Sequence, residues 1–532
     1  MSDLHLSSII PKIKARKWFI LQLAISRLVV LALLLASDLL VPLPSSVENP
    51  PALYSMPSSR RSLSWLSSPF QRALGTFEVW DSVHYLRLSS LERGVHPRLE
   101  DIAFHRFYPG LIKFSSDLIE CVTSLKVPPT MISLTISNAS FVVSGLLLSL
   151  YAEMTLTTSA TFLRTLEYIY ILTPSNVFNS TTNVESVIST FIYLYYFLKL
   201  FKYDGLYGAG FVAFLAGSCK STGGVAIAVT AIYNVLVHLF GPTARQSSSL
   251  LFHNGVEAVM AITPIFLHDK NMRDTFCDPN NIAHKVSQGY PQICSDGGWM
   301  YKNVQQHVWE TGWPFSYWKF KNIPHFFLAG CTCYFVFEGL YVWCGVFCRR
   351  VRSKLEIPQH ESISKHLVNV AFDSAGRTRP YLQTLRSYSK VLSLSCSLLL
   401  PASAPKSPAQ PPLSPNSKTQ GSRHEDTMTP PEFWALMDVQ PFASPSLSMH
   451  MVSMVFLAML VMIMAHVNIV TRIVASHCMS FYWVLAGRIT AGAADLQVIF
   501  DDPTNHTRAL CSYLLIFNVV GIIMYSNYLP WV

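Results

Sequence analysis

Long apolar segments are the feature that most constrains how this chain can fold. The first runs from Phe19 to Val41 and is long enough, as a helix, to cross a hydrocarbon layer of about 30 Å. Further apolar segments lie at residues 131–151, 162–177, 184–200, 206–217, 225–240, 250–267, 326–347, 452–470 and 512–529. Several are short or contain Pro or Gly, which is typical of kinked, re-entrant or bundle-buried membrane helices. The pattern predicts an all-α polytopic membrane protein, a multispanning helical bundle.

Composition and charge agree with a membrane class. Charged residues make up 13% of the 532 residues and hydrophobic residues 50%, whereas soluble domains carry about 25% charged residues. The net charge of +9 would also suit nucleic acid. However, the basic clusters at residues 12–17 and 349–354 each flank an apolar segment, which is typical of cytosolic topology signals. We therefore expect a membrane setting and no nucleic-acid partner.

The two basic clusters predict one topology. The N-terminus lies in the cytosol, and loops at about 42–127 and 270–321 lie on the opposite side, the lumen of the endoplasmic reticulum in a eukaryote. Cys277 and Cys294 fall in the second loop, so a disulfide between them is one interpretation if that loop is lumenal.

Three regions follow from the composition along the chain. Residues 1–352 form an N-terminal transmembrane region, 353–447 an insert, and 448–532 a C-terminal transmembrane region. The insert is rich in Ser and Pro and cannot bury a core, so we expect it to be disordered and cytosolic.

The segment Trp80-Asp81-Ser82-Val83-His84-Tyr85 is the first candidate site. In a helix, Asp81 and His84 share one face. A carboxylate beside aromatic rings at a membrane boundary is partly desolvated, which raises its pKa toward the range useful for a base. The alternative interpretation is a solvated helix-capping Asp beside a neutral His.

Other polar residues interrupt the apolar segments. Each has a plain structural alternative: an interfacial aromatic belt, a polar turn, a paired charge or a basic side chain that reaches the interface. The candidate substrate-binding residues are Trp80, His105, Tyr108, Glu185, Lys220, Trp309, His466 and Arg472. Lys220-Ser221 lacks the upstream glycine spacing of a phosphate-binding loop for ATP. The chain also contains none of the metalloprotease, serine-hydrolase, dinucleotide or zinc motifs, so we expect no metal and no cofactor.

The order of these motifs resembles the GPI mannosyltransferase 2 family, the second mannosyltransferases of glycosylphosphatidylinositol (GPI) anchor assembly. The resemblance starts with Trp80-Asp81-x-x-His84-aromatic after the first membrane anchor. It continues through Phe107-Tyr108-Pro109-Gly110, Pro174-Ser175, Glu185-Ser186, Trp309-Glu310-Thr311-Gly312, residues 322–326, His466-Val467, Thr471-Arg472, Tyr482-Trp483 and Leu529-Pro530-Trp531. This chain departs from the family at Lys220-Ser221-Thr222-Gly223, where Arg-Ser-Asn-Gly is usual, and at Asn183-Val184, where Tyr-Ser is usual.

The resemblance implies a GT-C-type enzyme of the endoplasmic reticulum membrane with a lumenal active site. It would transfer an α-1,6-linked mannose from dolichyl-phosphate mannose to a one-mannose GPI precursor glycolipid, with a small accessory membrane subunit. Asp81 would be the base, Lys220 or Arg472 would stabilise the departing phosphate, and His84 and His105 would assist. The alternatives are another dolichyl-phosphate-mannose-dependent GT-C mannosyltransferase, or a non-catalytic or transport membrane protein.

Overall fold

The computed structural model describes most of the chain outside the insert. The described residues are 9–40, 74–78, 81–90, 98–156, 159–201, 203–240, 248–279, 292–295, 297–307, 318–354, 447–465, 469–490 and 505–526. The insert predicted at 353–447 lies almost wholly outside them, and the three predicted regions stay predictions.

Within these residues every regular element is a helix. In chain order they are α1 (Ile9–Ala15), α2 (Lys17–Leu40), α4 (Asp81–Ser89), the 3₁₀ helix η6 (Leu99–Ala103), α5 (Phe107–Thr123), α6 (Pro129–Leu156), α7 (Ala160–Ile171), α8 (Asn176–Ser180), α9 (Glu185–Leu198), α10 (Tyr203–Cys219), α11 (Ser221–Phe240), α12 (Ser248–Cys277), α14 (Gln292–Ser295), α15 (Met300–His307), the 3₁₀ helix η7 (Phe320–Asn322), α16 (Ile323–Lys354), α20 (Leu447–Met464), α21 (Ile469–His477), α22 (Met479–Thr490) and α24 (Asn505–Ser526).

Six of the described helices are long and apolar enough to cross a membrane, and a bent pair, α21 with α22, raises the number to seven. They are Lys17–Leu40, Pro129–Leu156, Ser249–Cys277, His325–Val346, Leu447–Met464 and Thr507–Ser526. The 24 residues of α2 give a helix about 36 Å long, enough for the hydrocarbon layer. The prediction of an all-α polytopic membrane protein is confirmed.

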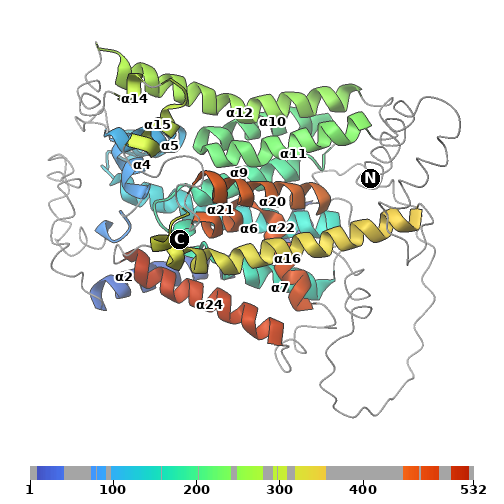
Figure 1. The fold of residues 1–532 in the computed structure, drawn as a ribbon. Helices are drawn as coiled ribbons and strands as arrows, with labels where there is room; N and C mark the ends of the chain where they lie inside the picture. The colour runs from blue at the N-terminus through green and yellow to red at the C-terminus, as the bar shows by residue number, and fades with distance from the viewer. Residues whose placement is uncertain are drawn as a thin grey trace, which may run out of the picture.

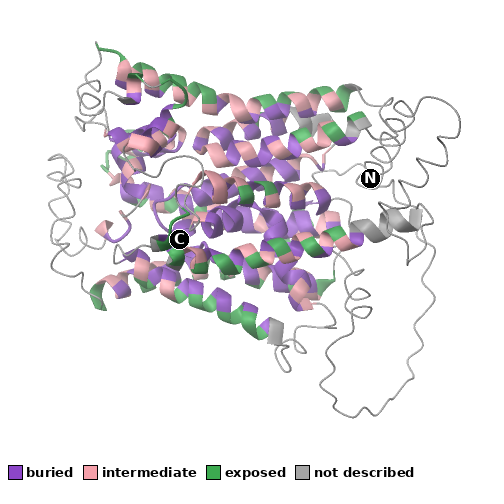
Figure 2. Cartoon of the chain, in the orientation of Figure 1, coloured by how far each residue is buried: buried purple, intermediate pink, exposed green. Residues whose placement is uncertain are grey.

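The long helices lie side by side in one bundle (Figure 1). α9 packs between α6 and α10, while α12 covers α10 and α11 on one outer side and α24 packs on α2 at the other. Exposed residues lie on the outer helices and buried ones fill the interior (Figure 2). Large apolar side chains such as Leu28, Phe252 and Phe327 are exposed on the outer faces of span helices, as expected for surfaces that meet lipid.

Many polar side chains, some of them charged, are buried inside the bundle. The first span buries Arg27, whose Nη1 donates to Ser180 Oγ at 2.6 Å. Its guanidinium also lies 3.6 Å from the centre of the Phe141 ring, a cation–π contact. Charged groups at membrane depth are costly, so their burial among partners marks the interior as the place to seek function.

Short elements gather at one end of the bundle. There α4, α5, α14 and α15 cluster beside the end of α12 (Figure 1). Leu99 and Ile102 of η6 pack with Phe276, Ile293 and Val304 in a small apolar core separate from the main one. Cys277 and Cys294 form a disulfide that links the end of α12 to α14, so the pairing considered from the sequence is present.

Three breaks in helix geometry interrupt the interior at this end. α10 and α11 are separated at Lys220, α8 is a buried helix of five residues, and α21 meets α22 at an angle of 88°. Backbone of this kind at membrane depth requires partners from the protein or from water. The breaks carry the polar groups described next.

Candidate active site

Asp81 is the first residue of α4 and the most accessible acid of the site. Its side chain is 31% exposed, and its Oδ2 accepts a hydrogen bond from Arg472 Nη2 at 2.5 Å. Burial acts to raise the pKa of Asp81, but the nearby charges of Arg472 and Lys220 outweigh it and lower the pKa to about 2. Asp81 is therefore an anion at neutral pH.

Arg472 connects Asp81 to a second carboxylate. It lies on α21 and is buried, and its Nε donates to Glu185 Oε1 at 2.6 Å while its Nη2 contacts the same oxygen. The Phe178 ring lies 4.6 Å from the guanidinium carbon on another side. The guanidinium thus has its orientation fixed by two carboxylates and an aromatic face.

Lys220 completes the cluster from the break between α10 and α11. Its Nζ donates to Glu185 Oε1 at 3.0 Å, and its side chain is 23% exposed whereas that of Glu185 is 0% exposed. A Cβ on Gly224 would collide with the carbonyl oxygen of Ala261 on α12. Glycine at this position therefore allows the first turn of α11 to pack directly on α12.

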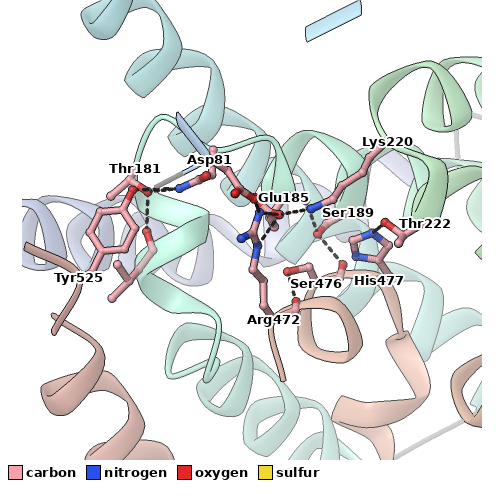
Figure 3. Close-up of polar contacts among 12 residues, drawn as sticks. Asp81, Thr181, Glu185, Ser189, Lys220, Thr222, Arg472, Ser476, His477 and Tyr525 are labelled. Atoms are coloured by element: carbon pink, nitrogen blue, oxygen red, sulfur yellow. Dashed lines mark hydrogen bonds and ion pairs between the residues drawn. The ribbon is translucent and has the colours of Figure 1, made fainter. Parts of the chain in front are cut away.

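The four side chains form one alternating network, Asp81–Arg472–Glu185–Lys220 (Figure 3). Two negative and two positive charges balance, which is how buried charges are tolerated. Glu185 lies at the back, and the partly exposed groups are Asp81 and Lys220. The accessible side therefore combines the Asp81 carboxylate with the Lys220 cation, and the buried Arg472 cation lies directly beside Asp81. This arrangement suits a substrate carrying both a hydroxyl and a phosphate.

A second set of hydrogen bonds links the helices that carry the cations. Ser189 Oγ of α9 donates to the carbonyl of Ser476 at 2.5 Å, and Ser476 Oγ donates to the Arg472 carbonyl at 2.6 Å. Thr222 Oγ1 and His477 Nε2 are 3.0 Å apart, which joins the start of α11 to the end of α21 (Figure 3). Ser189, Ser476 and His477 were not among the candidates predicted from the sequence, because none of them stands in a charged motif.

Two of the three histidines considered from the sequence, His84 and His105, lie beside the network. His105 is buried, its Nε2 lies 2.9 Å from Ser221 Oγ, and its ring stacks on His268 with centroids 4.1 Å apart. Burial, reinforced by His268 and Lys220, lowers the pKa of His105 well below its usual value, so His105 is neutral. His105 thus supports the residue that follows Lys220.

His84 and Tyr108 take other partners. His84 Nδ1 lies 2.8 Å from Asp101 Oδ1. Within the described part of the chain, His84 and Asp81 form no hydrogen bond with each other. Tyr108 is fully buried with its hydroxyl 2.7 Å from Ser133 Oγ. Asp101 was absent from the candidates, because no local sequence signal links it to His84 and Arg87.

The remaining candidates are Trp80, Trp309 and His466, which lie outside the described residues. Among the residues that the structure describes, no group of three or more His, Cys, Asp or Glu side chains is arranged to hold a metal ion.

The fold and this cluster define a multispanning membrane protein with a charged polar site inside one end of its helical bundle. Comparison with known proteins assigns the chain to one family. A family model described as Mannosyltransferase (PIG-V) matches residues 16–532, and the chain belongs to this family. The chain is also 22% identical over 363 residues to GPI mannosyltransferase 2 of Drosophila melanogaster, covering 62% of this chain and 77% of the relative. No solved structure matches.

Membership identifies the protein as a glycosyltransferase of the GPI mannosyltransferase family, and the family implies a glycolipid acceptor and a sugar donor. The resemblance noted from the ordered motifs is confirmed.

Proposed function

We propose that the protein transfers the second mannose of the GPI anchor, in α-1,6 linkage, from dolichyl-phosphate mannose to a one-mannose precursor. The observation that carries the proposal is the Asp81–Arg472–Glu185–Lys220 network, which sets a partly exposed carboxylate beside two cations. The name of the Drosophila relative, GPI mannosyltransferase 2, supports the choice of the second mannose.

The proposed reaction needs a base and a cationic phosphate site. Asp81 takes the proton of the acceptor hydroxyl as its oxygen attacks C1 of the donor mannose. The bond from C1 to the phosphate oxygen breaks, and dolichyl phosphate leaves with the electron pair, so the sugar carbon is inverted. Arg472 and Lys220 stabilise the charge that grows on the departing phosphate. Because the leaving group is a phosphate, the reaction needs no second carboxylic acid to protonate it, unlike glycoside hydrolysis.

The low pKa of Asp81 is compatible with this role once a phosphate is bound. In the structure, Arg472 and Lys220 lower that pKa. A donor phosphate that binds both cations offsets their charge, so Asp81 becomes a stronger base when the donor is in place.

We place the reaction on the lumenal side of the endoplasmic reticulum membrane. The Cys277–Cys294 disulfide supports this side, because structural disulfides persist in oxidising compartments. It joins α12 to α14, and Phe276 and Ile293 of these helices pack with η6, beside α4. The proposal includes a small accessory membrane subunit and requires neither a metal nor another cofactor.

The test uses cells that lack the second GPI mannosyltransferase. We compare wild type, Asp81→Asn and the control Asp117→Asn, whose carboxylate is 51% exposed on α5, at equal expression. Wild type and the control should convert the one-mannose intermediate to the two-mannose product, and Asp81→Asn should be slower by about 10²–10⁴-fold. Failure of wild type to extend the intermediate refutes the substrate assignment. An active Asp81→Asn refutes the role of base.

A further inference from the structure

Asp101 is a buried carboxylate at the lumenal end of the bundle that the proposed reaction does not use. Its Oδ1 accepts from Arg87 Nη1 at 3.0 Å and lies 2.8 Å from His84 Nδ1. Its Oδ2 accepts from the backbone N–H of Arg98 at 2.8 Å. The side chain is 0% exposed, so its position is set by these three donors.

The backbone of Asp101 belongs to η6, which packs in the small extramembrane core outside α4. Asp101 lies in η6, whose neighbours Leu99 and Ile102 pack with side chains of α12, α14 and α15. His268 Nε2 also lies 2.9 Å from the carbonyl oxygen of Ile102. The disulfide between α12 and α14 closes this core. Asp101 therefore links this small apolar core to α4, the helix that begins with Asp81.

The contact with Asp101 determines which nitrogen of His84 carries the proton. Both carboxylate oxygens of Asp101 act as acceptors, Oδ1 from Arg87 and Oδ2 from the backbone of Arg98. The shared hydrogen between His84 and Asp101 must then lie on Nδ1, which leaves Nε2 of a neutral imidazole as an acceptor. The ring is held further by stacking on Phe104, with centroids 4.4 Å apart and planes 9° apart.

His84, whose Nε2 is left as an acceptor, lies on the same face of α4 as Asp81, the proposed base. Asp81 and His84 are three residues apart on α4, so their side chains are neighbours. The side chain of His84 is 20% exposed, and among the described residues Nε2 has no hydrogen-bond donor. One sugar ring can therefore reach both side chains.

We infer that Asp101 is a positioning residue that keeps His84 in the Nδ1–H form, so that His84 Nε2 accepts a hydrogen bond from a hydroxyl of the acceptor mannose other than the one that reacts at Asp81. This inference rests on the proposed function, because it concerns the acceptor of that reaction. It assigns the selection of the acceptor sugar to α4 and the phosphate contacts to Arg472 and Lys220.

The test is steady-state kinetics in membranes with soluble one-mannose acceptor analogues and dolichyl-phosphate mannose. Asp101→Asn keeps the shape, and an amide oxygen at the Oδ2 position can still accept from the Arg98 N–H. Its amide nitrogen then lies at the Oδ1 position, where it can donate to His84 Nδ1 and reverse the tautomer but no longer accepts the hydrogen bond from Arg87. The KM for the acceptor should rise about tenfold, the value of one hydrogen bond, while the KM for the donor is unchanged. Asp101→Glu should recover part of the loss, and Asp117→Asn should match wild type.

Deoxy acceptors separate this role from a general structural one. Wild type should lose about tenfold in kcat/KM on the analogue that lacks the selected hydroxyl. Asp101→Asn and His84→Ala should show no further loss on that analogue. If Asp101→Asn raises both KM values equally, or if no single deoxy analogue removes the difference, the inference is wrong. An inactive wild type would instead refute the proposed function itself.

Discussion

Replacing Glu185 with Gln removes one negative charge from a network in which two carboxylates balance two cations. Asp81 alone then faces Arg472 and Lys220, and one positive charge is left without a partner. Glu185 is 0% exposed, so solvent cannot compensate. Breaking a buried pair on one side typically costs about 3–5 kcal/mol, and we expect a loss of this size from the free energy of unfolding.

A second substitution turns this expectation into a test of charge balance. Lys220→Met alone leaves Glu185 bound by Arg472, so the loss should be about 1.5–3 kcal/mol, the value of one charged hydrogen bond. In the double variant, Asp81 and Arg472 again balance each other. The double variant should therefore be less destabilised than the sum of the two single losses, by about 0.5–3 kcal/mol.

The assay is thermal unfolding of the purified protein in detergent, with the four proteins of the cycle measured side by side. An exposed pair on α5 and its following turn, Glu120 and Lys126, supplies a matched cycle, because its atoms are 3.5 Å apart but both side chains are more than one-third exposed. That control should show a coupling below about 1 kcal/mol. Additive losses in the Glu185–Lys220 cycle would refute the charge-balance reasoning. Transferase activity should stay low in the double variant, since a cation of the proposed phosphate site is absent.

Three further outcomes follow from the same geometry. The lowered pKa of Asp81, about 2, means that its ion pair stabilises the protein fully above the ordinary value of 3.8 and loses this effect as the pH falls toward 2. Unfolding midpoints of wild type and Asp81→Asn should converge only at that acid end, and convergence near neutral pH would contradict the assignment. Cys277→Ser opens a disulfide across 17 residues and should cost about 3 kcal/mol in thermal unfolding, whereas Cys121→Ser, at an exposed free cysteine, should cost none. Gly224→Ala meets backbone and should lower stability by about 1–3 kcal/mol, while Gly255→Ala, where a Cβ meets open space, should stay within about 1 kcal/mol of wild type on the same measurement.

Hydropathy alone was sufficient to predict the helical membrane fold. The segment expected from Phe19 to Val41 is α2, Lys17–Leu40, because an apolar run of this length has no other stable arrangement in lipid. Local composition also selected Lys220, since a lysine among apolar residues is expensive without a partner, and the structure pairs it with Glu185.

Local sequence patterns could not predict which of the charged residues pair with one another. Asp81, Glu185, Lys220 and Arg472 were each selected individually, yet no spacing rule joins Arg472 to Asp81 across 391 residues. Asp101 was missed for the same reason. Its importance comes from His84 and Arg87, which precede it by 17 and 14 residues and approach it only because η6 folds back on α4.

The long separation between Asp81 and Arg472 also has a consequence for biogenesis. Glu185 and Lys220 are only 35 residues apart and can pair once α11 has been made, whereas Arg472 emerges from the ribosome much later. Until then the inserted part of the cluster holds two carboxylates, Asp81 and Glu185, and one cation, Lys220. This leaves an excess negative charge inside a membrane bundle. The last helices therefore complete the neutralisation of the first ones, and a prematurely terminated chain would expose this imbalance to the quality control of its membrane.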